Sequence, residues 1–192
     1  MLRMLKSRLA QSIMPVIVLL VAVAAIAASA APARATALDD YVAAPDPSYL
    51  WSAADKRQLS DGVTLHQLDL MSQTWQGILW QHRLQVAVPS GGLQRKTVLL
   101  YITGSESDPQ EQVFMGTLAK RLSAPVAILY DIPNQPLYDG LREDPLVSYT
   151  FAKFLETGDA TWPLLFPMVK GATRAMDAIS EFTARDLGWA VD

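Results

Sequence analysis

The clearest secondary-structure pattern lies in residues 78–88. Every second residue there is apolar or aromatic, apart from one histidine, and the residues between them are more polar. This period of two predicts a β-strand with one buried face. Residues 63–70 alternate less regularly and predict a preceding strand. The residues of the buried face are Ile78, Trp80, His82, Leu84, Val86 and Val88.

A strand–helix–strand unit follows in residues 97–132. Residues 97–102 and 125–132 are mostly apolar runs, which are typical of strands covered on both faces. Between them, Asp108-Pro109-Gln110-Glu111 has the residue types of a helix start. The unit has the size of a parallel βαβ motif. Together with the earlier strands, it predicts an α/β sheet whose first strands are antiparallel and whose interior is parallel.

Two further helical patterns complete the chain. The first begins at Asp144-Pro145 and runs to about Glu156, and Gly158 ends it. The second begins near Thr161, and its large apolar residues at helical spacing predict one buried side. The residues of that side are Leu165, Met168, Val169, Ala172, Met176, Ile179 and Phe182.

Residues 36–62 show no regular pattern and are rich in Asp, Pro and Ser. The segment Ala44-Pro45-Asp46-Pro47 excludes a continuous helix or a central strand at that point. We therefore predict an irregular N-terminal arm that lies over the body of the protein. Tyr41, Tyr49 and Trp51 are its expected attachment points.

Residues 1–35 have the composition of an export signal. Residues 1–8 carry three positive charges, residues 13–28 are apolar, and small residues follow in Ala-x-Ala spacing. This order predicts a secretory signal peptide that is cleaved, so the mature protein is expected in the periplasm or outside the cell. The alternative is a membrane anchor formed by residues 13–33, because about 20 apolar residues can span a bilayer.

Composition narrows the possible functions. Four of the 16 basic residues lie in the first 35 positions, which leaves 12 against 19 acidic residues and argues against nucleic-acid binding. The absence of cysteine excludes disulfides, zinc fingers and thiol nucleophiles. His66 and His82 match no metal-binding motif, so we expect no metal or cofactor. His82 lies on an apolar strand face and is interpreted as a hydrogen-bonded core residue.

Several segments resemble a known family. They are LDDYVAAPDPSY (38–49), LDLMSQTW (68–75), LWQHRLQVAVP (79–89), IPNQPLYDG (132–140) and YTFAKFLETGDATWPLLFPMVKGATRAMDAISEF (149–182). On these residues the chain resembles the PhoPQ-activated pathogenicity-related protein family. The resemblance implies an exported protein with an α/β-hydrolase-like fold, and expression that in some members is linked to antimicrobial-peptide stress.

The chain departs from a complete α/β-hydrolase. Those enzymes place a serine nucleophile on a sharp strand-to-helix turn, with the acid and the histidine later in the chain. No Gly-x-Ser-x-Gly segment occurs in the sequence, and no histidine follows His82. We therefore predict that residues 63–192 are the N-terminal part of an α/β-hydrolase-like domain, in a fragment or truncated form that is not catalytic alone. The alternative is a short exported binding or stress-response protein that is not an enzyme.

Two loops are candidates for a functional site. Gly104 and Ser105 follow the third strand, where α/β-hydrolases place a backbone N–H of the oxyanion hole, although a plain turn would need the same residues. Asn134, Gln135 and Tyr138 follow the next strand, and loops at this end of parallel strands border ligand crevices. The alternative is that these residues supply turn geometry. A small molecule or a peptide is the expected ligand, and membrane contact is expected only through the signal segment.

Overall fold

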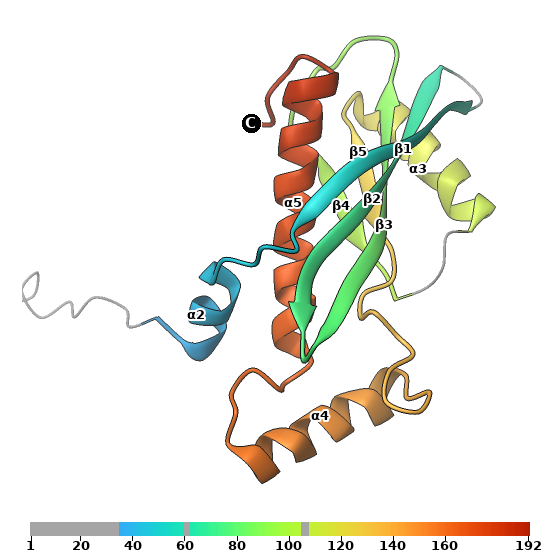
Figure 1. The fold of residues 1–192 in the computed structure, drawn as a ribbon. Helices are drawn as coiled ribbons and strands as arrows, with labels where there is room; N and C mark the ends of the chain where they lie inside the picture. The colour runs from blue at the N-terminus through green and yellow to red at the C-terminus, as the bar shows by residue number, and fades with distance from the viewer. Residues whose placement is uncertain (1–34, 60–61, 105–107) are drawn as a thin grey trace, which may run out of the picture. The chain divides into compact units, whose positions relative to one another are not determined.

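The computed structural model describes residues 35–59, 62–104 and 108–192. Residues 1–34, which make up nearly all of the predicted signal segment, and Ser105 lie outside the described residues. Residues Ala37–Asp192 form one compact unit. No helix of the described ranges is long and apolar enough to cross a membrane. The elements, shown in Figure 1, are α2 (Ala37–Ala43), β1 (Leu50–Leu59), β2 (Val63–Trp75), β3 (Ile78–Pro89), β4 (Leu99–Ile102), α3 (Pro109–Leu122), β5 (Val126–Leu129), α4 (Glu143–Thr157) and α5 (Leu165–Asp186).

The five described strands form one mixed sheet in the order β1-β2-β3-β5-β4. The pairs β1–β2, β2–β3 and β3–β5 are antiparallel, and β4 and β5 are parallel. Helix α3 connects β4 to β5, which completes the predicted βαβ unit. The fold class is therefore confirmed as α/β, with antiparallel first strands followed by a parallel pair.

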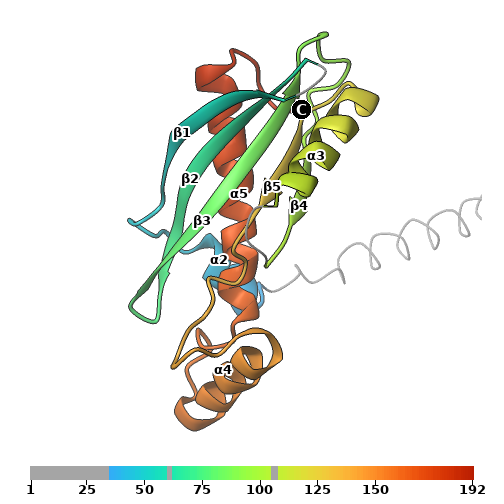
Figure 2. The same cartoon turned by 90° about the vertical axis from the view of Figure 1, so that its right-hand side faces the viewer.

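Helices α3 and α5 cover opposite faces of the sheet (Figure 2). Side chains that alternate along β2 and β3 divide between two hydrophobic clusters. Leu68, Leu70 and Leu84 join the cluster that includes Ala178 and Phe182 of α5. The α3 cluster contains Val63, Leu65, Ala87, Met115 and Ala119. Helix α3 covers only the part of its sheet face that contains these residues. The remainder of that face is not covered by α3.

Helix α5 buries part of the side that its large apolar residues predicted. Ile179 and Phe182 are buried and Met168 packs against the same cluster, but the prediction is wrong for three other residues. Leu165, Val169 and Met176 are 48%, 41% and 52% exposed. The contact side also contains small residues, which let the helix approach the sheet closely. A Cβ added at Gly171 would lie 2.9 Å from Cδ1 of Ile132. The small residues that α5 buries are Gly171, Ala175 and Ala178.

The segment predicted as an irregular arm contains regular structure, so that prediction is wrong for residues 37–43 and 50–59. The prolines lie between α2 and β1, and they interrupt the chain only there. Strand β1 pairs with β2 at the edge of the sheet. Its residues 52–58 are all exposed, and an exposed edge strand lacks the apolar alternation by which strands are recognised.

The three predicted attachment points hold this segment to the body. Oη of Tyr41 donates to Oε1 of Gln73 at 2.7 Å. Nε1 of Trp51 donates to Oε2 of Glu181 on α5 at 2.5 Å, and Oη of Tyr49 donates to Oε1 of the same residue at 3.3 Å. The aromatic residues therefore fasten both elements of the N-terminal segment.

Lys170 of α5 binds the end of α2. Its side chain is buried, and Nζ donates to the main-chain oxygens of Ala44 at 2.8 Å and of Tyr41 at 3.4 Å. The last carbonyls of a helix have no partner within the helix, and a cation is favoured there. Burial lowers the pKa of Lys170, and the nearby Asp46 carboxylate opposes that shift.

Replacing Lys170 with methionine should release α2 from α5. Methionine keeps an apolar stem but donates no hydrogen bond, so the two main-chain oxygens lose a charged donor, at about 1–3 kcal/mol. Limited proteolysis should cut residues 44–48 faster in K170M, and urea unfolding should show that loss. Lys153→Met is the matched control, because Lys153 pairs with Glu156 at the surface. Equal losses in the two variants would contradict the role of Lys170.

Candidate functional site

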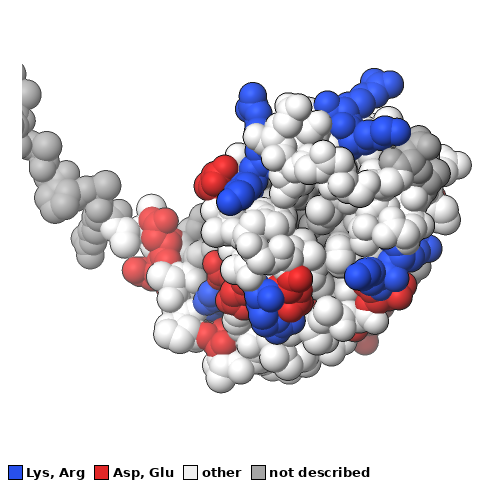
Figure 3. Space-filling model, turned by 90° about the horizontal axis from the view of Figure 1, so that it is seen from above, with Lys and Arg blue, Asp and Glu red and all other residues white. Residues whose placement is uncertain are grey.

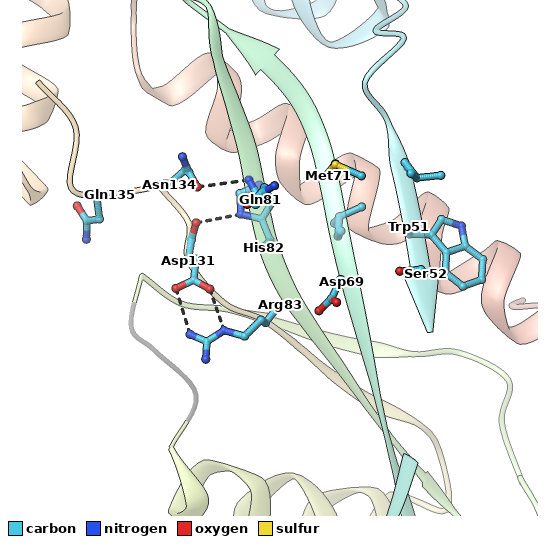
Figure 4. A pocket seen from close by; sticks show the side chains of 12 residues that line it. Trp51, Ser52, Asp69, Met71, Gln81, His82, Arg83, Asp131, Asn134 and Gln135 are labelled. Atoms are coloured by element: carbon cyan, nitrogen blue, oxygen red, sulfur yellow. Dashed lines mark hydrogen bonds and ion pairs between the residues drawn. The ribbon is translucent and has the colours of Figure 1, made fainter. Parts of the chain in front are cut away.

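A polar cleft lies on the face of the sheet that α3 leaves open (Figure 4). Its volume is about 560 Å³. Strands β1, β2 and β3 form its floor, and the loop after β5 forms one wall. The polar residues that line it are Ser52, Asp69, Gln81, His82, Arg83, Asp131, Asn134 and Gln135.

The strand register places these polar side chains in rows across the sheet. Ser52 is opposite Asp69, and Asp69 is opposite Arg83. Residues that are directly opposite on neighbouring strands project to the same face. The next row, formed by Trp51, Leu70 and His82, projects to the other face, where it is buried beneath α5.

Arg83 and Asp131 form the charged centre of the cleft. Nε of Arg83 lies 3.2 Å from Oδ2 of Asp131, and Nη2 of Arg83 lies 3.4 Å from Oδ1. The ion pair is therefore bidentate (Figure 4). The two side chains are 36% and 28% exposed. An ion pair this open to solvent adds little stability, but its groups remain accessible to a ligand. No group of three or more His, Asp or Glu residues within the described ranges could hold a metal ion.

The loop that forms the wall of the cleft has unusual backbone conformations. Asp131, Tyr138, Asp139 and Glu143 all have positive φ angles, between 44° and 63°. Non-glycine residues rarely adopt this region. Each such residue costs about 1–3 kcal/mol and is retained most often at functional sites. The concentration of strain in residues 131–143 therefore favours a binding role for this loop.

Asn134 and Gln135, two of the predicted rim residues, line the cleft. Oδ1 of Asn134 accepts a hydrogen bond from the backbone N–H of Gln81 at 3.3 Å. Oε1 of Gln135 accepts from the backbone N–H of Glu143 at 2.9 Å, and Nε2 of Gln135 donates to the Glu143 carboxylate. The Asn134 bond holds the loop against β3, and the Gln135 bonds hold it to the start of α4.

Tyr138, the third predicted rim residue, lies elsewhere. The centroid of its ring lies 4.7 Å from that of Tyr149. It lies 6.2 Å from the ring of Trp75 and 6.0 Å from the ring of Trp162, which are ordinary distances for packed aromatic pairs. Tyr138 thus belongs to an aromatic cluster and is not among the residues that line this cleft.

Gly104 lies where β4 ends, against the same loop. A Cβ added there would be 3.2 Å from the main-chain oxygen of Ile132 and 3.6 Å from the side chains of Gln135 and Glu143. This close approach of two backbones explains a glycine at the position. Ser105 is outside the described residues, so the oxyanion role of this pair stays a prediction.

Behind the cleft lies a serine–histidine pair that sequence reasoning missed. Oγ of Ser72 is 2.9 Å from Nε2 of His82, and Nδ1 of His82 is 3.0 Å from the main-chain oxygen of Asp131. We assign the proton to Nδ1, which donates to the carbonyl, so that Nε2 accepts from the Ser72 hydroxyl. Ser72 falls at an irregularity in the β2–β3 register, and nothing in the sequence pattern signals it.

This pair has the hydrogen bonds of a nucleophile and its base, but it is sealed. Ser72 is 0% exposed and His82 is 3% exposed. Burial lowers the pKa of His82 to about 4, which keeps the imidazole neutral. The pair therefore links β2, β3 and the end of β5. His82 contributes to the lining of the cleft, but Ser72 is not among its lining residues.

Comparisons with known proteins identify the family. The model of the PhoPQ-activated pathogenicity-related protein family matches residues 38–191. Autocrine proliferation repressor protein A of Dictyostelium discoideum is 34% identical over 166 residues, which cover 77% of this chain and 33% of that relative. The chain thus spans about a third of the length of this curated relative. A solved glucuronoyl esterase from Solibacter usitatus matches with a TM-score of 0.41 and 13% identity, over 72% of this chain and 43% of that chain. The chain belongs to the PhoPQ-activated pathogenicity-related protein family.

Proposed function

We propose that this member of the PhoPQ-activated pathogenicity-related family is exported, and that its described residues bind a polar ligand and do not hydrolyse it alone. The main support for this proposal is a difference in solvent access between two groups of residues. The cleft around Arg83 and Asp131 is open and rich in donors and acceptors, whereas the Ser72–His82 pair is closed to solvent.

Export is supported by the N-terminal sequence and by the relative. Residues 1–35 have the order of a cleaved signal peptide. The name of the Dictyostelium relative describes an autocrine factor, which acts after release from the cell. The mass of the protein recovered from the exported fraction should give an N-terminus between Ala31 and Leu38. An intact Met1 would favour the alternative of a membrane anchor at residues 13–33.

The lack of hydrolysis is supported by the order of catalytic groups in the fold. A nucleophile elbow has the pattern Gly-x-Ser-x-Gly and precedes the acid and the histidine. This sequence has no such pattern and no histidine after His82. In the described residues, the serine–histidine pair of Ser72 and His82 is buried, so we expect no hydrolysis by this part of the chain alone.

The ligand is expected to be a small polar molecule or a peptide. On the face shown in Figure 3, the basic groups lie in separate clusters and do not form a continuous stripe. Nucleic-acid binding needs such a stripe or patch. The cleft instead offers a guanidinium, carboxylates and amides within one volume.

Replacing Arg83 with glutamine should weaken ligand binding at least tenfold, because a charge-assisted contact contributes about 1.5–3 kcal/mol. The probe is a set of small carboxylates, amines and sugars screened by NMR. Shifted resonances should gather at residues 81–83 and 131–135. Arg95→Gln, which changes an exposed arginine outside the cleft, is the matched control. Binding that is unaffected by R83Q, or that maps elsewhere, would contradict the proposal.

A short exported binding or stress-response protein is the second candidate. It is favoured by the burial of apolar residues on both faces of the sheet, which suits a self-sufficient domain. Such a domain should unfold in one cooperative transition. A partial domain should aggregate or lose cooperativity. Thermal unfolding with simultaneous light scattering separates the two candidates.

A further inference from the structure

Asp131 connects the cleft to the buried side of the sheet. His82 and Arg83 are neighbours on β3, so their side chains point to opposite faces. The carboxylate of Asp131 pairs with Arg83 in the cleft, and the main-chain oxygen of Asp131 lies 3.0 Å from Nδ1 of His82 (Figure 4). A single loop residue therefore contacts both side chains.

The backbone of Asp131 has an uncommon conformation. Its φ angle is 61°, in a region that residues with a side chain rarely adopt. The residues on either side of it are fixed to the sheet. The N–H of Tyr130 donates to the main-chain oxygen of Arg83 at 2.9 Å. The N–H of Ile132 donates to the main-chain oxygen of Thr103 at 3.2 Å. Such a conformation persists where the surrounding contacts determine it.

The Ser72–His82 pair supplies one of these contacts. The Asp131 oxygen can only accept, so Nδ1 of His82 carries the proton, and Nε2 accepts from the Ser72 hydroxyl at 2.9 Å. Ser72 and His82 are both buried, so water does not compete for these bonds. Gly171 of α5 leaves room for the ring, because a Cβ at that position would lie 3.5 Å from Nε2. The hydroxyl, the ring and the carbonyl form one chain of hydrogen bonds that ends at the wall of the cleft.

We infer that the Ser72–His82 pair positions the ligand-binding carboxylate of the cleft. Ser72 orients the imidazole, and His82 holds the carbonyl of Asp131. This bond keeps the Asp131 carboxylate directed at Arg83, whose Cζ also lies 5.9 Å from the centroid of the Tyr130 ring. Ser72 and His82 are therefore positioning residues that act through Asp131. The inference rests on the proposed binding function of the cleft.

Two substitutions of His82 separate positioning from stability. The amide nitrogen of asparagine falls close to the place of Nδ1, so His82→Asn retains a donor for the Asp131 oxygen. The amide nitrogen of glutamine falls close to the place of Nε2, so His82→Gln retains a partner for Ser72 but loses the donor to Asp131. H82N removes more buried atoms than H82Q, so a purely structural role predicts the larger defect in H82N. The positioning role predicts the larger defect in H82Q.

The Arg83 side chain reports this difference without a ligand. Hydrogen exchange of its Nε–H is slowed while the Asp131 carboxylate accepts from this group, and the NMR signal is assigned by its loss in Arg83→Lys. Exchange should be faster by about fivefold or more in H82Q and by less than about twofold in H82N, because the two differ by one hydrogen bond to Asp131. Exchange in H82Q that equals the wild-type rate, or a larger effect in H82N, would overturn the inference.

Ligand binding should follow the same order. In the NMR screen of small carboxylates, amines and sugars, H82Q should weaken binding by about fivefold and H82N by less than about twofold. If no ligand binds to the wild-type cleft, the proposed function fails, while the exchange of the Arg83 Nε–H still decides the positioning role.

A variant on the cleft side tests the same link without changing the core. Arg83→Gln alters a side chain that is 36% exposed and releases the Asp131 carboxylate. The NMR signal of the His82 Nδ1–H should therefore shift, and the ring signals of His66 should not. Arg95→Gln should shift neither histidine. A wild-type His82 ring that carries its proton on Nε2, or an Nδ1–H signal that R83Q leaves unchanged, would overturn the inference.

Discussion

Replacing His82 with leucine is expected to lower the free energy of unfolding by about 2–4 kcal/mol at pH 7. The variant leaves the Ser72 hydroxyl and the main-chain oxygen of Asp131 without the partners that His82 supplies. Each buried polar group that loses its partner costs about 1–3 kcal/mol. Urea unfolding, followed by tryptophan fluorescence and by circular dichroism, measures the loss.

The same side chain is expected to make the protein sensitive to acid. The pKa of His82 is about 4 in the folded chain, against an ordinary value of 6.5, because the ring is buried. Between these values the unfolded chain binds a proton that the folded chain does not. The stabilising effect of the neutral ring is therefore fully present above pH 6.5 and is lost as the pH falls toward 4. The difference corresponds to roughly 3 kcal/mol, and His82→Leu should remove this part of the pH dependence.

His66→Leu is the control, since His66 and His82 are the two histidines of the sequence. The pKa of His66 is also lowered, first by burial and then by the charge of Lys56, while Asp186 opposes the shift. The ring of His66 packs against Phe182 with centroids 5.1 Å apart, and leucine can replace that contact in part. The variant should keep most of the acid dependence. An acid dependence that disappears in H66L and persists in H82L would contradict the role given to His82.

Replacing Gly171 with valine is expected to destabilise the fold by on the order of 3 kcal/mol. The new Cβ alone would lie 2.9 Å from Cδ1 of Ile132, 3.5 Å from Nε2 of His82 and 3.7 Å from Oγ of Ser72. A branched side chain needs still more room, so α5 must move away from the sheet and the Ser72–His82 bond must lengthen. Chemical unfolding measures the loss, and the NMR signals of the His82 ring report the change in its hydrogen bonds.

Gly116→Val is the matched control, because Gly116 is also buried in a helix that packs on the sheet. A Cβ at Gly116 would lie 3.2 Å from Cδ1 of Leu59, and the other atom within 4 Å also belongs to that side chain. A single half-buried side chain can move aside. The loss should therefore be less than half of that in G171V. Equal losses would show that the helical glycine itself, and not the close contact of α5, determines the effect.

The sheet could be predicted where burial leaves a pattern in the sequence. Strand β3 alternates because one face packs beneath α5, and β5 is continuously apolar because both of its faces are covered. Strand β1 could not be predicted, because its exposed residues are selected for solubility and edge protection. The contact side of α5 was predicted only in part, because Ile179 and Phe182 are buried whereas Leu165, Val169 and Met176 are exposed. Close packing also selects small residues such as Gly171 and Ala175.

Part of the candidate site could be predicted from the position of two residues after a strand. Asn134 and Gln135 follow from the rule that loops at the carboxyl ends of parallel strands border crevices. The row of Ser52, Asp69 and Arg83 did not follow. Alternation marks these side chains as polar, but it does not show that α3 stops short and leaves their face uncovered. The pairing of Ser72 with His82 depends on a local change of register, which no residue type signals.

Labelling with a fluorophosphonate probe tests the central claim most directly, because the probe reacts with activated serines whatever the substrate is. The purified chain is incubated with the probe beside a known serine hydrolase, and its serines are then examined by peptide mass. The account predicts no adduct on any serine of the chain, since Ser72, the serine that pairs with His82, is closed to solvent. A stoichiometric adduct would contradict it, and loss of that adduct in the Ser72→Ala variant would show that the buried pair opens and acts as a catalytic one.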